Sequence, residues 1–230
     1  VLSAAVKRNS IGGAWVEAAG VAETRNPSNT DEVVGVYACG GAADAQAAVS
    51  AAVAASADWA RSPPLERHEV LRKAAAELHA RADGIGELLS REEGKTRAEG
   101  VAETRRAAQI LFFFAGECLR AHGAHLDSTR PGVSVDVTRE PLGVVALITP
   151  WNFPIAIPAW KVAPALAFGN TIVLKPAEAA PGCARLLVDI LQRAGLPAGV
   201  LNLVMGQGGT VGQAMLDSAE VDAISFTGSV

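Results

Sequence analysis

The stretch Leu147-Ile-Thr-Pro-Trp-Asn-Phe-Pro154 decides the fold, because an apolar run ends there at a polar turn between two prolines. Residues 144–148 read Val-Val-Ala-Leu-Ile, the composition of a strand buried on both faces of a parallel sheet. The turn places Asn152 past the carboxyl end of that strand, where open α/β sheets bind ligands. Asn152 can cap the next helix or donate its amide hydrogens to an oxyanion, and the residue alone does not decide between these roles.

Strands and helices alternate on the C-terminal side of this stretch. Strands are predicted over 144–148, 171–174, 200–204 and 223–226, and helices over 157–168, 181–194 and 210–216. Gly169 and Gly195 directly follow two of the helices, as glycines commonly do. This alternation predicts an α/β fold built on a Rossmann-like parallel sheet with right-handed crossovers.

The N-terminal side is predicted to begin with short extended segments and to continue as helices. A strand and turn are expected at 11–16, and a turn at 26–30 precedes an apolar stretch at 33–37. Apolar residues recur at helical spacing over 45–60, 65–82, 85–93 and 99–119. We expect Asp44 to be the N-cap of the first helix, and the run Ile110-Leu-Phe-Phe-Phe114 to lie in the core.

Composition limits the classes of function. Half of the 230 residues are hydrophobic and 19% are charged, which describes a globular protein rather than a disordered one. A net charge of −4 without a basic cluster argues against nucleic acid as a partner. No apolar run is long enough to cross a bilayer, and the N-terminus lacks the order of a secretory signal. We therefore expect a cytoplasmic protein with no membrane partner.

The cysteines and histidines do not predict a disulfide framework or a metal site. Cys39, Cys118 and Cys183 are widely spaced. His122 and His125 stand three residues apart, but no cysteine or carboxylate follows at ligand spacing. Reduced structural thiols and surface histidines are the expected roles.

Three further motifs follow the predicted strands: Lys175-Pro-Ala-Glu178, Gly206-Gln-Gly208-Gly-Thr-Val-Gly212 and Phe226-Thr-Gly-Ser229. Lys175 and Glu178 can bind the hydroxyls of a ribose or form a simple exposed ion pair. A carboxylate there would repel a 2′-phosphate, which favours NAD over NADP. The glycine spacing is one residue longer than the common dinucleotide fingerprint. Ser229 can donate to a pyrophosphate oxygen, cap a helix, or do both.

Together with Pro150-Trp-Asn-Phe-Pro154, these motifs closely resemble the aldehyde dehydrogenase superfamily in their order and spacing. The resemblance implies that NAD, with NADP also possible, accepts a hydride from a small-molecule aldehyde. It implies that a cysteine thiolate attacks the aldehyde, that Asn152 forms half of an oxyanion hole, and that a glutamate activates the hydrolytic water. The residues that it assigns to cofactor binding are Ile148, Thr149, Pro150, Trp151, Asn152, Lys175, Pro176, Ala177, Glu178, Gly208, Gly212, Phe226, Thr227, Gly228 and Ser229.

The resemblance also divides the chain into three parts. Residues 1–126 would be the N-terminal strand and helix part of the cofactor domain, and 143–230 its Rossmann-like NAD-binding part. Residues 127–142 resemble a hairpin that family members extend for oligomerisation, because Val133, Val135 and Val137 alternate with polar residues after a Pro-Gly turn. A projecting strand with unpaired edges favours pairing with another subunit, so a homodimer or homotetramer is expected.

Two functional residues of the family lie outside the chain. The nucleophilic Cys and the general-base Glu both fall beyond residue 230, so we expect the N-terminal part of a longer enzyme. Cys183 is not a substitute, because it falls in the helix after Lys175–Glu178, on the adenosine side. The family builds part of its substrate tunnel from the helix at 99–119, which is the alternative to a core role for the aromatic run.

The segment from Arg139 to Lys161 most resembles enzymes acting on semialdehydes of short dicarboxylic acids, such as 2-oxoglutarate or succinate semialdehyde. The predicted reaction is therefore oxidation of such an aldehyde to the acid through a cysteine thiohemiacetal. The absent Cys and Glu leave a non-catalytic nucleotide-binding or interaction fragment as an alternative. An acyl-CoA-forming reductase of the same superfamily is a further alternative, although Pro150–Pro154 fits the hydrolytic branch better.

Overall fold

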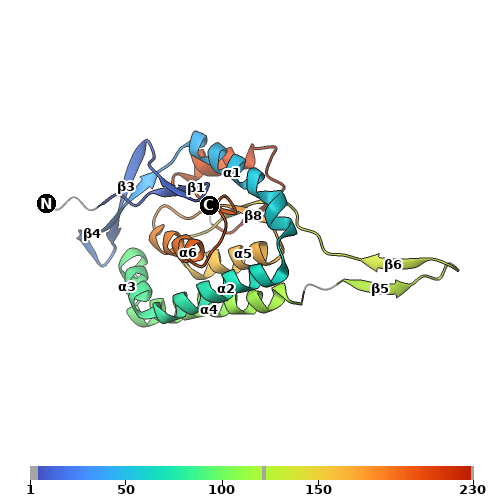
Figure 1. Cartoon of the computed structure of the whole chain (residues 1–230). Helices are drawn as coiled ribbons and strands as arrows, with labels where there is room; N and C mark the ends of the chain where they lie inside the picture. The colour runs from blue at the N-terminus through green and yellow to red at the C-terminus, as the bar shows by residue number, and fades with distance from the viewer. Residues whose placement is uncertain (1–4, 121–122, 229–230) are drawn as a thin grey trace.

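The computed structural model describes residues 5–120 and 123–228, and a six-stranded sheet lies at its centre (Figure 1). The strand order is β10-β7-β8-β9-β1-β2. These strands are β1 (Asn9–Ile11), β2 (Ala14–Val16), β7 (Val144–Ile148), β8 (Thr171–Lys175), β9 (Leu201–Leu203) and β10 (Ala223–Phe226). The four later strands are parallel, and β1 and β2 extend the sheet in antiparallel pairing. The predicted α/β fold with a parallel sheet is confirmed.

Residues of the central strands alternate between two apolar layers, because successive side chains of a strand point to opposite faces. Val145 and Leu147 belong to the larger core, together with residues of α5 (Ala156–Ala167) and α6 (Gly182–Arg193). Val144 and Ala146 pack with residues of α1 (Ala42–Arg61) on the other face. Figure 1 shows α1 on the opposite side of the sheet from α5 and α6. Burial on both faces explains why residues 144–148 are all apolar.

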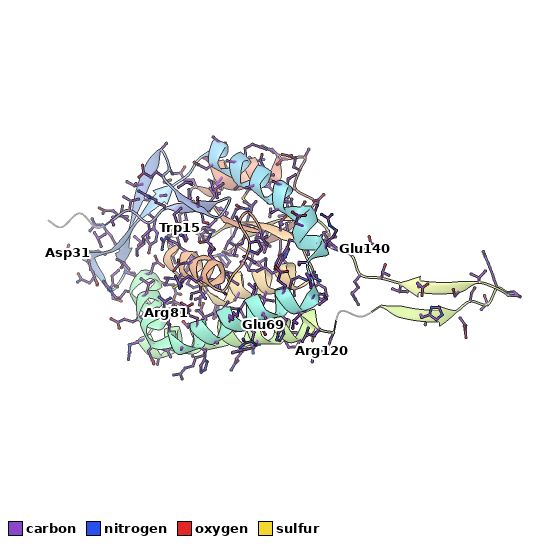
Figure 2. All side chains as sticks on the ribbon, in the orientation of Figure 1. Trp15, Asp31, Glu69, Arg81, Arg120 and Glu140 are labelled. Atoms are coloured by element: carbon purple, nitrogen blue, oxygen red, sulfur yellow. The ribbon has the colours of Figure 1, made fainter. Side chains whose placement is uncertain are left out.

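Three helices form an outer layer beyond α5 and α6 (Figure 1). They are α2 (Pro64–Ala80), α3 (Ala82–Glu93) and α4 (Arg97–Cys118). Helix α4 contacts α2, α3 and α5. Its crossing with α3 is close, since a Cβ at Gly100 would collide with the carbonyl oxygen of Gly86. Figure 2 shows charged side chains such as Glu69 on the outer surface of this layer, where Glu69 pairs with Arg72 at 2.8 Å.

Several local predictions were wrong in detail. Asp44 is not the N-cap of α1; Gly41 is, and the Asp44 carboxylate accepts a hydrogen bond from the Gly41 N–H at 2.8 Å. The segment predicted as one helix at 210–216 begins as a π-helix, η1 (Gly208–Gly212), and only then becomes α7 (Gln213–Leu216). In the aromatic run, Leu111 is buried but Phe113 is 58% exposed, so the core prediction holds for only part of it.

Two strand pairs lie outside the central sheet. Strands β3 (Gly20–Asn26) and β4 (Asn29–Cys39) form one, and the apolar stretch 33–37 lies inside β4. Strands β5 (Ala124–Asp127) and β6 (Ser134–Val137) form a hairpin that projects from the body (Figure 1). The valine alternation predicted β6, whereas β5, which alternates over only four residues, was not predicted. No helix in the described part of the chain is both long enough and apolar enough to span a membrane.

Candidate functional site

The ends of three parallel strands meet in one row. Ile148 of β7 pairs with Lys175 of β8 on one side and with Phe226 of β10 on the other. Backbone hydrogen bonds extend the row past the strands, from Thr149 N to Lys175 O at 3.1 Å and from Thr227 N to Ile148 O at 3.0 Å. The sheet therefore brings together residues of three motifs that are far apart in the sequence.

Glu178 joins the lysine motif to the glycine motif. Its Oε1 lies 3.7 Å from Lys175 Nζ and accepts a hydrogen bond from Gly208 N at 2.9 Å. The Lys175 side chain is 6% exposed and that of Glu178 is 51% exposed. Burial lowers the pKa of Lys175, and the Glu178 carboxylate opposes this shift. Oε2 of Glu178 remains free of hydrogen bonds within the described residues, so it can accept one from a ligand.

Gly208 and Gly212 keep space open beside the row. A Cβ at Gly208 would lie 3.9 Å from Lys175 Nζ, and one at Gly212 would lie 3.7 Å from Ile148 Cδ1. Thr149, which follows Ile148 in the chain, is 3% exposed, and its hydroxyl has no hydrogen-bond partner among the residues that the structure describes. The buried hydroxyls of Thr24 and Thr171 are likewise unpaired within these residues, so this feature alone does not mark a ligand site.

The remaining residues predicted to bind the cofactor lie in the segments that follow β7, β8 and β10. Pro150 and Trp151 lie in the loop after β7, where Trp151 is 52% exposed and shares a small cavity with Glu178. Pro176 and Ala177 connect Lys175 to Glu178, and Thr227 and Gly228 follow β10. Ser229 lies outside the described residues.

Asn152 lies in the loop between β7 and α5, and its backbone is held from outside the sheet. Its carbonyl oxygen accepts a hydrogen bond from Lys95 Nζ at 3.0 Å, and the same ammonium bonds Glu103 Oε2 at 2.6 Å. The other oxygen of Glu103 accepts from the N–H groups of Ile155 and Ala156, each at 3.1 Å. Glu103 therefore satisfies the first N–H groups of α5, and Asn152 does not cap this helix.

The Asn152 side chain is exposed and makes no hydrogen bond within the described part of the chain. It lines a cavity of about 590 Å³ between α4 and the start of α5. One wall carries Phe153, Ala156 and Trp160, and the other carries Ala102 and Arg106. The alternative prediction placed the aromatic run 110–114 in a substrate tunnel, but none of these residues lines this cavity. Helix α4 contributes residues within 99–106 to it instead.

Sequence reasoning missed Lys95, Glu103 and Arg106. One signal was available for Glu103, which lies on the inward face of α4 with buried Gly100 and Ala107. A charged residue at an apolar helical position is usually paired, and here its partners are Lys95 and the backbone of α5.

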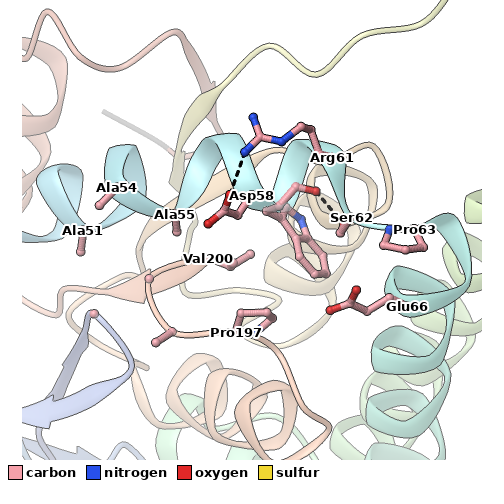
Figure 3. A pocket seen from close by; sticks show the side chains of 14 residues that line it. Ala51, Ala54, Ala55, Asp58, Arg61, Ser62, Pro63, Glu66, Pro197 and Val200 are labelled. Atoms are coloured by element: carbon pink, nitrogen blue, oxygen red, sulfur yellow. Dashed lines mark hydrogen bonds and ion pairs between the residues drawn. The ribbon is translucent and has the colours of Figure 1, made fainter.

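A larger cavity, of about 780 Å³, lies elsewhere, between α1, the start of α2 and residues 197–200 (Figure 3). Its charged groups include Asp58 and Arg61, which pair with each other at 2.8 Å, and Glu66. None of the predicted site residues lines it. Size alone therefore does not identify the chemical site of this chain.

The buried cysteines are poor nucleophiles. Cys183 in α6 is 0% exposed, and burial raises its pKa well above the ordinary value. Burial also raises the pKa of Cys118 to about 11. The described residues contain no group of three or more His, Cys, Asp or Glu side chains arranged to hold a metal ion.

Comparison with known proteins identifies the family. Residues 15–230 match the family model described as "Aldehyde dehydrogenase family". The chain is 46% identical over 224 residues to an alpha-ketoglutarate semialdehyde dehydrogenase of Haloferax volcanii, covering 96% of this chain and 46% of that protein. It is 42% identical over 204 residues to a 2,5-dioxopentanoate dehydrogenase of Saccharolobus solfataricus, covering 89% of this chain and 43% of that protein.

The structural comparison agrees. A crystal structure of betaine aldehyde dehydrogenase from Staphylococcus aureus in complex with NAD+ matches with a TM-score of 0.91 and 33% identity, covering 96% of this chain and 44% of that one. The chain spans about half the length of the curated relatives that it matches. From its motifs, its fold and these matches, the chain belongs to the aldehyde dehydrogenase family.

Proposed function

We propose that the protein containing this chain oxidises a short dicarboxylic semialdehyde, such as 2-oxoglutarate semialdehyde (2,5-dioxopentanoate), to the carboxylic acid, with NAD as the hydride acceptor. Family membership supports aldehyde oxidation, and the names of the two relatives support the substrate. The observation that carries the proposal is the row at the strand ends, where Ile148, Lys175 and Phe226 lie side by side next to Glu178 and Gly208.

The residues of this row fit a dinucleotide. Lys175 offers a donor, and the free oxygen of Glu178 offers an acceptor for a ribose hydroxyl. Side chains at Gly208 and Gly212 would fill the space beside the row, and the Thr149 hydroxyl lacks a partner among the described residues. When bound, the nicotinamide accepts a hydride from the substrate. NADP fits less well, because the Glu178 carboxylate would repel a 2′-phosphate.

Asn152 has the properties of an oxyanion donor. Its backbone is held by Lys95 while its amide group is free to donate into the cavity between α4 and α5. Such a fixed donor stabilises the negative charge that develops on an aldehyde oxygen during nucleophilic attack. Burial disfavours the thiolates of Cys118 and Cys183, and Cys39 does not line the cavity that contains Asn152, so we propose that the attacking cysteine lies in another part of the protein.

An assay of NADH formation with both cofactors tests this function. The full-length protein should reduce NAD in the presence of 2,5-dioxopentanoate, with a preference over NADP. Glu178→Ser should narrow the preference by about tenfold, because it removes a carboxylate whose repulsion of a phosphate is worth about 1.4 kcal/mol. Glu178→Gln is the matched control: it keeps an acceptor for Gly208 N but loses the charge, so the preference should narrow similarly. An unchanged ratio in both variants would count against Glu178 as the ribose contact.

We also propose that the β5–β6 hairpin joins copies of this protein. Its register places Ala124 opposite Val137 and Leu126 opposite Val135, so one face is apolar. Leu126 is 52% exposed and Val135 is 41% exposed. On the opposite face, His125 pairs with Asp136 at 2.6 Å. An apolar face on a projecting hairpin fits a second copy of the same surface, as closed symmetric dimers require.

Val135→Lys should shift the full-length protein from an oligomer towards the monomer, because it places a charge in the apolar face. Ser134→Lys adds the same charge to the other face and should leave the oligomer intact. Molar mass from light scattering distinguishes the variants. Dissociation by both substitutions, or by neither, would contradict an interface on this face.

A further inference from the structure

Arg106 shares a cavity with Asn152, the proposed oxyanion donor. It lies on the same face of α4 as Glu99, Ala102 and Glu103, at the spacing of successive helical turns. Across the cavity, Phe153 and Trp160 supply an apolar wall next to Asn152. A small molecule in this cavity of about 590 Å³ therefore meets an amide, aromatic surface and a guanidinium.

The other charged groups of the cavity are already engaged. Lys95 bonds Glu103 at 2.6 Å and lies 3.3 Å from Glu93. Glu99 accepts hydrogen bonds from the backbone N–H and the hydroxyl of Thr96, at 3.0 and 2.7 Å, and these bonds hold its pKa below the ordinary value. Within the described residues, Arg106 has neither an ion pair nor a hydrogen bond. Its planar set of five donors is thus available to a ligand.

We propose that Arg106 binds the carboxylate at the far end of the aldehyde substrate and thereby selects semialdehydes of dicarboxylic acids. This inference rests on the proposed function. With the aldehyde oxygen at Asn152, the methylene groups of the substrate lie against Phe153 and Trp160, and its carboxylate reaches Arg106. A guanidinium binds a carboxylate through two parallel hydrogen bonds, and a 2-oxo acid presents a further acceptor beside its carboxylate.

The test compares two aldehydes of equal chain length, 2,5-dioxopentanoate and pentanal, with the full-length protein and NAD. Arg106→Met keeps an unbranched apolar side chain but removes the charge. It should lower kcat/KM for 2,5-dioxopentanoate by about 10- to 100-fold, the range for a hydrogen bond to a charged group. Pentanal has no carboxylate, so its kcat/KM in Arg106→Met should stay within about threefold of the wild-type value. A threefold change corresponds to less than about 1.4 kcal/mol, the free energy of a tenfold change.

Two control variants sharpen the comparison. Arg106→Lys keeps the positive charge but lacks the planar guanidinium. Its kcat/KM for 2,5-dioxopentanoate should therefore lie between those of Arg106→Met and the wild type. Arg105→Met removes the neighbouring arginine, which does not line the cavity, and should leave both substrates unaffected. Equal losses for both aldehydes with Arg106→Met, or unchanged kinetics with 2,5-dioxopentanoate, would overturn the role of Arg106.

A binding measurement separates this proposal from the function on which it rests. If the wild-type protein oxidises neither aldehyde, the proposed function fails, and calorimetric titration with glutarate still tests Arg106. Glutarate should bind the wild type and lose affinity by about tenfold or more in Arg106→Met. Equal affinity in the two proteins, or no binding to the wild type, would overturn carboxylate recognition by Arg106.

Discussion

Asn152→Ala in the full-length protein should lower kcat for aldehyde oxidation by about 100- to 1000-fold, the usual cost of removing one oxyanion donor. The amide is free of other hydrogen bonds in the described part of the chain, while the backbone at Asn152 is fixed by Lys95. In the proposed role, the variant loses the donor for the developing charge but keeps the backbone contact that holds the loop. Steady-state kinetics measure the loss in kcat.

The affinity for NAD and the thermal stability should change little in Asn152→Ala, because Lys95 bonds the backbone carbonyl that alanine retains. Asn152→Asp is the matched control, since it keeps the shape of the side chain but replaces its donors by acceptors. We expect it to lose at least as much activity as alanine. Weakened NAD binding with an unchanged kcat would contradict the oxyanion role.

The fold was predictable where local pattern and tertiary environment agree. Residues 144–148 are apolar without alternation, and the structure buries both faces of β7. Prediction failed where a pairing partner, rather than a long local pattern, decides the conformation. In β5, Ala124 and Leu126 alternate with polar residues over four positions only, and the segment is a strand because it pairs with β6. The π-helix at Gly208–Gly212 likewise has no periodic signature in a segment rich in glycine.

The part of the candidate site that lies at the ends of the parallel strands was predictable. Motifs at the ends of successive parallel strands must meet at one edge, which is why Ile148, Lys175 and Phe226 fall in one row. The residues contributed by α4 and by the turn before it were not predictable, because no rule of spacing connects Lys95 or Glu103 to Asn152 more than forty residues later. Only the packing of α4 against α5 brings them together.

Glu103 is the residue of this outer layer whose loss should have the largest effect on stability. Its side chain is 3% exposed and that of Lys95 is 13% exposed, so both charges are largely removed from water. Glu103→Ala leaves the ammonium without its nearest carboxylate and two N–H groups of α5 without an acceptor. Breaking a buried ion pair from one side typically costs about 3–5 kcal/mol, and we expect a loss in that range in the free energy of unfolding.

Glu103→Gln separates the two roles of this carboxylate. The amide oxygen of glutamine can still accept from Ile155 N and Ala156 N, whereas the ion pair with Lys95 is lost. Urea unfolding should therefore show a smaller loss for glutamine than for alanine. Among the described residues, Lys95 then has only Glu93 as a carboxylate partner, at 3.3 Å. This weakens the hold of Lys95 on the Asn152 carbonyl, so kcat should fall while KM for NAD stays unchanged. Equal stability losses in the two variants would show that capping of α5 contributes nothing, and an unchanged kcat in Glu103→Gln would show that Asn152 is positioned without this ion pair.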